Sequence, residues 1–279
     1  MTEKYLKGKT AMVTGGASGI GRAIALALAE AGADAAIGSL LAIDGVTRPA
    51  REDTYLPTGD ELARTRASIE AHGVKALALP LDVCSDESVQ AFYDAAIEAF
   101  GKVDILANAA GTDLYQTMVG HPDALWHKVI DTNLNANYRT IKRCLPGMIE
   151  RKWGRIIVIA STAASVGAAG HAAYCAAKSG LLGLMRCVAL EGAPHGVSCN
   201  AISPATVETT MAETSFMHEF ERGGGKKTMD ELRAQVLATY PQNRFLQPSE
   251  IGALAAFLCR DEAFGISMEN VTISAGALW

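Results

Sequence analysis

The chain has 279 residues, of which 49% are hydrophobic and 20% are charged, and its formal net charge is −5. This composition is that of an ordinary globular protein and excludes a largely disordered chain. The length suits one large α/β domain or two small ones. The charge leaves no basic stripe to neutralise phosphates, so we expect no nucleic-acid partner.

Cysteine usage and the N-terminus bear on the compartment. The six cysteines are widely spaced and form no Cys-x-x-Cys pair. This usage is typical of buried thiols in a reducing compartment and predicts neither a disulfide framework nor a metal site. The N-terminus lacks the apolar run of a secretory signal, and no uninterrupted apolar segment has the length to cross a bilayer. We therefore expect a cytoplasmic protein without membrane contact.

Short apolar runs alternate with longer helical patterns along the whole chain. The predicted strands are Thr10–Thr14, Asp34–Gly38, Ala76–Leu81, Asp104–Ala107, Arg155–Ala160, Val197–Ile202 and Asn270–Ile273. The predicted helices are Gly21–Ala31, Glu61–His72, Asp86–Phe100, Trp126–Glu150, Ala173–Leu190 and Ser249–Leu258. Such alternation indicates parallel strands joined by right-handed crossovers, with helices on both faces of one sheet. No repeat or linker divides residues 1–279, which predicts a single domain.

Two long segments interrupt this alternation. Residues 40–60 form a polar insertion after the second strand, and residues 205–245 carry scattered methionines and aromatics around three consecutive glycines. Loops of this length in a compact domain are usually functional or disordered. We expect the second segment to form part of a substrate lobe.

A glycine-rich turn follows the first strand. Gly15, Gly19 and Gly21 stand between that strand and the first helical pattern. Glycines permit a tight turn and let the backbone approach a pyrophosphate at a helix N-terminus. A plain strand-to-helix turn is the alternative interpretation of this pattern alone.

Tyr174 and Lys178 begin an apolar helical pattern. A spacing of four places both side chains on one helix face. A free tyrosine hydroxyl has a pKa near 10, and a nearby ammonium would favour the tyrosinate and lower that pKa. The pair suggests an acid–base residue but is not specific by itself.

Together these motifs resemble the short-chain dehydrogenase/reductase family over nearly the whole chain. The matching pieces come in the family's order, and Ser161 lies 13 residues before Tyr174, the usual family separation. The resemblance implies a Rossmann fold, that is, a doubly wound α/β domain with a mostly parallel seven-stranded sheet. It also implies an NAD(P)-dependent oxidoreductase that interconverts a secondary alcohol and its ketone.

The resemblance further implies roles for four catalytic residues. Tyr174 would exchange the proton with the substrate oxygen, and Ser161 would hydrogen-bond the carbonyl. Lys178 would hold the nicotinamide ribose and lower the pKa of Tyr174. Asn133 would bind a water that links Lys178 to solvent; helix capping is the alternative for this residue. The expected cofactor-binding residues are Gly15, Ser18, Gly19, Ile20, Gly21, Ser39, Asp82, Val83, Asn108, Ala109, Ala110, Gly111, Tyr174, Lys178, Pro204, Val207 and Thr209.

The sequence departs from the family's pattern at three places. Ser39 stands where an Asp for the adenosine ribose is common, Ala205 replaces the expected Gly after Pro204, and Ser274-Ala275-Gly276 replaces Asp-Gly-Gly. Recognition of a 2′-phosphate needs an Arg or Lys near the ribose, and neither Ser18 nor Ser39 supplies one. We therefore expect NAD rather than NADP, although Arg48 and Arg51 of the insertion could reverse this preference.

The insertion at 40–60 is similar to that of the carveol dehydrogenase-like branch, in which it covers the cofactor. We expect it to fold over the adenosine half of the cofactor; a surface loop without cofactor contact is the alternative. Residues expected to shape an apolar site for the alcohol or ketone are Leu114, Tyr115, Val166, His171, Met211, Phe216, Met217 and Trp279.

Two other functions are compatible with these motifs. One alternative is an NADPH-dependent 3-oxoacyl thioester reductase of the same family. The other is a non-catalytic nucleotide-sensing regulator, which usually lacks the Tyr or the Lys that this chain retains. The helix near 172–193 carries small residues on several faces, more than one sheet contact needs. The resemblance implies that this helix and the one near 126–150 pair across a two-fold axis, so we expect a homotetramer, or failing that a dimer.

Overall fold

A seven-stranded parallel sheet forms the centre of the protein, with the strand order β3-β2-β1-β4-β5-β6-β7. The computed structural model describes residues 4–42, 55–224 and 228–277. The strands are β1 (Thr10–Thr14), β2 (Asp34–Ser39), β3 (Ala76–Pro80), β4 (Ile105–Asn108), β5 (Gly154–Ile159), β6 (Val197–Pro204) and β7 (Asn270–Ile273). The predicted doubly wound Rossmann fold is confirmed.

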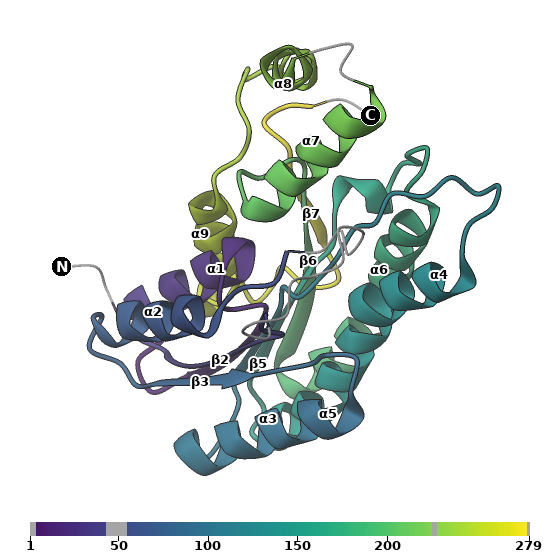
Figure 1. Ribbon diagram of the computed structural model, residues 1–279. Helices are drawn as coiled ribbons and strands as arrows, with labels where there is room; N and C mark the ends of the chain where they lie inside the picture. The colour runs from purple at the N-terminus through teal and green to yellow at the C-terminus, as the bar shows by residue number, and fades with distance from the viewer. Residues whose placement is uncertain (1–3, 43–54, 225–227, 278–279) are drawn as a thin grey trace.

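Helices cover both faces of this sheet (Figure 1). The helices are α1 (Gly19–Glu30), α2 (Gly59–Glu70), α3 (Asp86–Phe100), α4 (Asp123–Ile130), α5 (Ala136–Glu150), α6 (Ala172–Gly192), α7 (Thr210–Arg222), α8 (Met229–Leu237) and α9 (Pro248–Leu258). Helices α1, α2 and α9 pack on one face, and α3, α5 and α6 pack on the other. Helices α7 and α8 lie beyond the end of the sheet at which β6 finishes.

Successive residues of each strand serve two different cores. Val13 of β1 and Ile157 of β5 face the core under α1 and α9, whereas Met12 and Ile156 face the core under α3, α5 and α6. Side chains alternate between the two faces of a strand, so a strand covered on both faces must be apolar throughout. This is why the strands are recognisable as short apolar runs.

The helices differ from the prediction in two segments. The predicted helix Trp126–Glu150 begins earlier, at Asp123, and is interrupted by a π-helical turn over Asp131–Asn135 that separates α4 from α5. The segment 205–245, for which no helix is predicted, contains α7 and α8. Both have polar faces, and each is capped by a threonine, Thr209 and Thr228 respectively.

One helical stretch and three of the thiols bear on the expected compartment. Within the described residues, Ala172–His195 is long and apolar enough to span a bilayer by length and composition alone, but Lys178, Arg186 and Glu191 interrupt it, so the expectation of no uninterrupted apolar segment is not contradicted. Its Leu181 and Met185 are buried in the core beside β6, which explains this composition. Thiols Cys144, Cys199 and Cys259 are buried as expected, but Cys84 and Cys175 are half-buried and Cys187 is exposed.

The packing of α1 on α9 predicts a sharp effect of one added methyl group. A Cβ on Gly252 of α9 would lie 2.5 Å from the carbonyl oxygen of Ala23 in α1. We expect Gly252→Ala to destabilise the protein by about 1–3 kcal/mol through overpacking, measured by urea unfolding. Gly59→Ala is the control, because its Cβ would meet nothing within 4 Å and the change should be neutral or slightly stabilising. Equal stability of the two variants would contradict this account of the interface.

Candidate active site

The glycine turn after β1 is built from backbone contacts that leave no space for side chains. Gly15 has φ +71°, and a Cβ on it would lie 2.9 Å from the amide nitrogen of Ala110. A Cβ on Gly21 would overlap the Gly15 carbonyl. Ser18 makes no side-chain capping bond to α1, and the first turn of α1 holds no acidic residue. The turn therefore presents the amides of a helix N-terminus as a site for an anion.

The ends of β1 and β4 meet beside this turn. The hydroxyl oxygen of Thr14 accepts hydrogen bonds from the amides of Ala109 and Ala110, both at 3.2 Å. Strand order reverses between β1 and β4, so their connections diverge to opposite faces of the sheet. Open α/β sheets bind ligands in the crevice at such a switch point.

A cavity of about 680 Å³ occupies this crevice. The predicted site residues that line it are Gly15, Ser18, Gly19, Ile20, Gly21, Ser39, Asp82, Val83, Ala109, Ala110, Gly111, Asn133, Ser161, Tyr174, Lys178, Pro204, Val207 and Thr209. Asn108 is the exception: it is buried, and its Oδ1 accepts a hydrogen bond from the Thr140 hydroxyl at 3.0 Å. The structure thus gives Asn108 a position behind the cavity wall.

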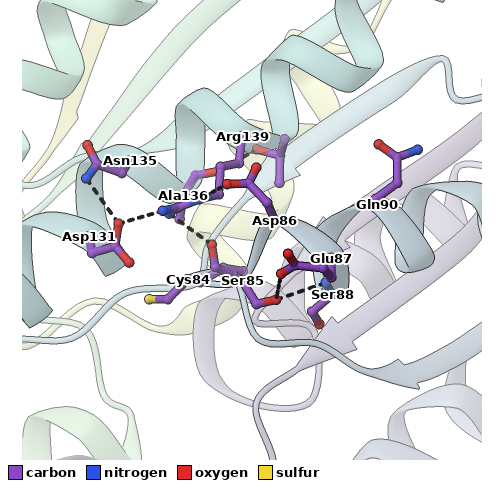
Figure 2. Close-up of polar contacts among 12 residues, drawn as sticks. Cys84, Ser85, Asp86, Glu87, Ser88, Gln90, Asp131, Asn135, Ala136 and Arg139 are labelled. Atoms are coloured by element: carbon purple, nitrogen blue, oxygen red, sulfur yellow. Dashed lines mark hydrogen bonds and ion pairs between the residues drawn. The ribbon is translucent and has the colours of Figure 1, made fainter.

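Arg139 of α5 lies between the turn after β3 and the π-helical turn (Figure 2). Asp82 uses its Oδ1 to accept the Cys84 amide at 2.8 Å, which fixes the turn after β3. Arg139 of α5 donates to the carbonyl of Val83 at 3.4 Å and to Asp131 of the π-helical turn at 2.8 Å. The guanidinium therefore links the expected adenine-binding turn to the turn that carries Asn133.

Asn133 is fully buried in that π-helical turn. Its amide nitrogen donates to the carbonyls of Thr112 at 2.7 Å and Val129 at 2.9 Å, and its Oδ1 accepts the Thr112 amide at 3.3 Å. The main-chain oxygen of Asn133 accepts from the side chain of Asn137 at 2.9 Å. The side chain braces the loop after β4 and does not cap a helix, and its role toward a water stays a prediction.

The cavity is also lined by the three expected catalytic residues Ser161, Tyr174 and Lys178. Burial raises the pKa of Tyr174, Asp113 raises it further, and a hydrogen bond with Ser161 lowers it. Burial also lowers the pKa of Lys178 to about 8, against the opposing effect of Asp113. The Lys178 ammonium donates to the carbonyl of Ile159 at 2.8 Å and lies 5.4 Å from the centre of the Tyr174 ring. Because its pKa is raised, Tyr174 carries its proton at neutral pH. The expected lowering of this pKa by Lys178 stays a prediction.

Sequence reasoning missed a polar cluster beside Tyr174. Asp113, two residues after Gly111, lines the cavity and pairs with Nδ1 of His171 at 2.9 Å. The His171 ring meets Tyr115 edge-to-face at 5.5 Å. Arg222 at the end of α7 lies 3.8 Å from the centre of the Tyr115 ring. A carboxylate two residues after the family's Asn-Ala-Ala-Gly segment was the available signal for this cluster.

The expected substrate-shaping residues divide into two groups. His171, Met211 and Phe216 line the cavity. Leu114 is instead buried in a small core with Val129 and Ala173, so the prediction for it is wrong. Tyr115, Val166 and Met217 are partly exposed and are not among the lining residues, and Trp279 lies outside the described residues.

The insertion begins and ends at the cavity. The Ala42 amide donates to the carbonyl of Pro57 at 2.8 Å, so the two ends of the segment lie together. Tyr55, Leu56 and Pro57 line the cavity beside Ser39. Arg48 and Arg51 lie outside the described residues.

Comparison with known proteins shows the family. The family model for short chain dehydrogenase matches residues 9–219, and the chain belongs to this family of NAD(P)-binding oxidoreductases. The 3-oxoacyl-(acyl-carrier-protein) reductase of Pseudomonas aeruginosa is 34% identical over 271 residues, 97% of this chain and 98% of that protein. The D-beta-hydroxybutyrate dehydrogenase of Rhizobium meliloti is 32% identical over 268 residues, 96% of this chain and 98% of that protein.

A solved structure extends the likeness to three dimensions. A variant of the actinorhodin polyketide ketoreductase with NADPH matches with a TM-score of 0.86 at 30% identity, over 99% of this chain and 98% of that one. The relatives named above do not confirm the carveol dehydrogenase-like branch.

The buried lysine predicts a pH-dependent stability. Lys178 has a folded pKa of about 8, below its ordinary 10.5, so below pH 8 the folded state bears the cost of a buried ammonium. Between these two pKa values the unfolded state binds more protons, and this cost falls as pH rises. We expect Lys178→Met to gain roughly 1–3 kcal/mol relative to wild type at pH 7 and to lose that gain by pH 10.

Urea unfolding of both proteins at the two pH values measures this difference. Other titrating groups are common to both proteins, as is any pH-independent effect of the lost hydrogen bond to Ile159. A stability difference that is the same at pH 7 and pH 10 would contradict the burial of a charged Lys178.

Proposed function

We propose that this protein interconverts a secondary alcohol and its ketone by hydride transfer, with Tyr174 as the general acid and base. The observation that carries this proposal is that Tyr174, Ser161 and Lys178 lie on the wall of the same cavity that starts at the glycine turn. The proposed nucleotide site and the proposed proton donor thus share one cavity, as hydride transfer coupled to proton transfer requires.

Each residue has a distinct task in this reaction. The nicotinamide of a bound cofactor would supply or accept the hydride. Tyr174, protonated at neutral pH because burial raises its pKa, donates its proton to the ketone oxygen. Ser161 hydrogen-bonds the same oxygen and fixes it within reach of Tyr174. Lys178 holds the ribose hydroxyls, and its positive charge favours the tyrosinate when the reaction runs toward the ketone.

The cavity fits a dinucleotide at its other end. The uncapped N-terminus of α1 and the crowded glycine turn suit a pyrophosphate, and Asp82 and Val83 line the part expected to hold adenine. We favour NAD, because neither Ser18 nor Ser39 supplies a cation for a 2′-phosphate. The ketoreductase neighbour contains NADPH, which supports the opposite choice. The affinities of this protein for NAD and NADP distinguish the two.

A 3-oxoacyl thioester reductase is the second candidate. It is supported by the names of relatives that match over nearly the whole length of this chain. On the substrate side of the cavity, however, Asp113 and Glu219 place two acidic side chains, and carboxylates repel the phosphates of an acyl carrier. This arrangement favours an uncharged alcohol or ketone.

The insertion and the compartment complete the proposal. Because Tyr55, Leu56 and Pro57 line the cavity, we infer that the 40–60 segment covers the adenosine half of the cofactor. The reducing environment that suits six free thiols favours the cytoplasm.

Turnover against a substrate panel tests the proposed reaction. We expect the wild type to oxidise or reduce the cofactor with secondary alcohols or ketones more efficiently than with acetoacetyl-coenzyme A. Tyr174→Phe should lower turnover by about 10²–10⁴-fold while the cofactor still binds. Preference for the thioester would support the second candidate, and cofactor binding without any turnover would support the nucleotide-sensing regulator.

We also propose that the protein assembles as a homotetramer through α6. Exposed positions 176, 180, 183, 187 and 190 recur every three or four residues and form one stripe on this helix. The stripe consists of Ala176, Gly180, Gly183, Cys187 and Leu190, and Leu190 is 65% exposed. Small residues in such a stripe allow a helix of a second copy to approach closely.

Light scattering of two proteins tests this assembly. A Cβ on Gly183 would meet nothing within 4 Å of the single chain, so Gly183→Leu should fold but obstruct a partner helix. We expect a tetrameric or dimeric mass for the wild type at micromolar concentration and a smaller mass for Gly183→Leu, with unchanged circular dichroism. A monomeric wild type would contradict the proposal.

A further inference from the structure

The end of β2 lacks the acidic side chain that Rossmann folds commonly use to bind the adenosine ribose. Ser39 occupies this position, and its hydroxyl oxygen accepts the amide of Ala17 at 3.0 Å. The carbonyl of Ala17 in turn accepts the hydroxyl of Thr65 from α2 at 3.1 Å. Ser39 therefore braces the glycine turn and supplies no carboxylate to the ribose.

Tyr55 belongs to the same end of the cavity, which it lines together with Ser18, Ser39 and Leu40. Its hydroxyl donates to Oε1 of Glu61 at 2.5 Å, and a hydrogen bond with Ser18 lowers its pKa. Three side chains from the glycine turn, the end of the insertion and the first turn of α2 thus form one chain of hydrogen bonds.

Glu61 is held firmly at the end of this chain. Its Oε2 accepts the amide of Thr58 at 2.8 Å and the hydroxyl of Thr58 at 3.0 Å, in the capping box of α2. The hydrogen bond from Tyr55 lowers the pKa of Glu61, and the Thr58 amide and Arg64 lower it further. Burial and the bond to Glu61 raise the pKa of Tyr55 to about 12. Glu61 is therefore ionised and Tyr55 protonated at neutral pH.

These protonation states fix the direction of every hydrogen bond in the chain. A carboxylate only accepts, so Tyr55 must donate its single proton to Glu61. The Tyr55 oxygen can then only accept from Ser18, and Ser18 must donate to Tyr55. With its proton committed, the Ser18 hydroxyl presents lone pairs to the cavity.

We propose that the Ser18–Tyr55–Glu61 chain selects a cofactor with a free adenosine 2′-hydroxyl and disfavours one with a 2′-phosphate. This inference rests on the proposed dinucleotide site and identifies the residues that set its specificity. A 2′-hydroxyl donates to the lone pairs of Ser18. A 2′-phosphate has only acceptor oxygens and a charge of about −1.5 to −2, so it meets an acceptor and, one tyrosine further, the Glu61 carboxylate, whose charge Arg64 offsets in part.

Two variants separate hydrogen-bond direction from charge. Glu61→Gln removes the charge and lets the side-chain amide donate to Tyr55, so the chain can reverse and Ser18 can donate to a phosphate. Glutamine also preserves the capping box. Tyr55→Phe keeps the charge but frees the Ser18 proton. Asp60→Asn is the matched control, because it removes one charge from the same helical turn outside the hydrogen-bond chain.

Isothermal titration of each protein with NADH and NADPH measures the outcome without any substrate. We expect the wild type to bind NADH at least about tenfold more tightly, and Glu61→Gln to reduce this ratio by roughly three- to tenfold, as one screened charge allows. Tyr55→Phe should reduce the ratio less, and Asp60→Asn should leave it within about twofold of wild type. Thermal unfolding followed by circular dichroism checks that all variants fold.

The possible results distinguish this inference from the proposed function. Tight binding of both cofactors with a ratio that neither Glu61→Gln nor Tyr55→Phe changes would overturn the selector and leave the dehydrogenase proposal intact. A wild type that prefers NADPH would do the same. Failure of the wild type to bind either cofactor would overturn the proposed function itself.

Discussion

The absence of side chains at Gly15 and Gly21 is the constraint on which the nucleotide end of this cavity depends. At these residues the backbone of the turn after β1 lies against the start of α1 and the end of β4, with no room for a Cβ. Because of this contact, the first amides of α1 open into the crevice where the strand order reverses. Thr14 then ties the loop after β4 to the same point. Parallel strands end at one edge, so β5 and β6 bring Ser161 and Pro204 to the same cavity.

The catalytic wall is built at a cost in stability. Lys178 is almost completely buried, and burial disfavours its charged form. Asp113 partly offsets this effect through its negative charge, but the same charge raises the pKa of Tyr174. One carboxylate thus favours the charged lysine and the protonated tyrosine, while burial remains the larger influence on both pKa values. In the proposed reaction this combination favours donation of a proton to a ketone.

Much of the fold could be predicted because strands buried on both faces are apolar runs. The π-helical turn between α4 and α5 could not, since one wider turn barely disturbs a helical hydrophobic pattern. Most of the site residues expected from the family motifs line one cavity. The motifs could not show that Asn108 lies behind the cavity wall or that Leu114 belongs to the core. Nor could they reveal contacts between distant residues, such as Asp113 with His171, which depend on how two loops fold together.

The proposed dinucleotide would span the cavity, so the walls at its two ends have to keep a fixed separation. Arg139 ties together two of the turns that form these walls. Its guanidinium bonds both the turn after β3 and the π-helical turn, and it also pairs with Asp86 at the start of α3. Its side chain is only 15% exposed, so these bonds are less screened than those of a surface ion pair. In the π-helical turn Asp131 bonds Arg139 (Figure 2), while the Asn133 side chain braces Thr112. A local irregularity in one helix therefore couples the turn after β3, where we propose that adenine binds, to the loop that follows β4.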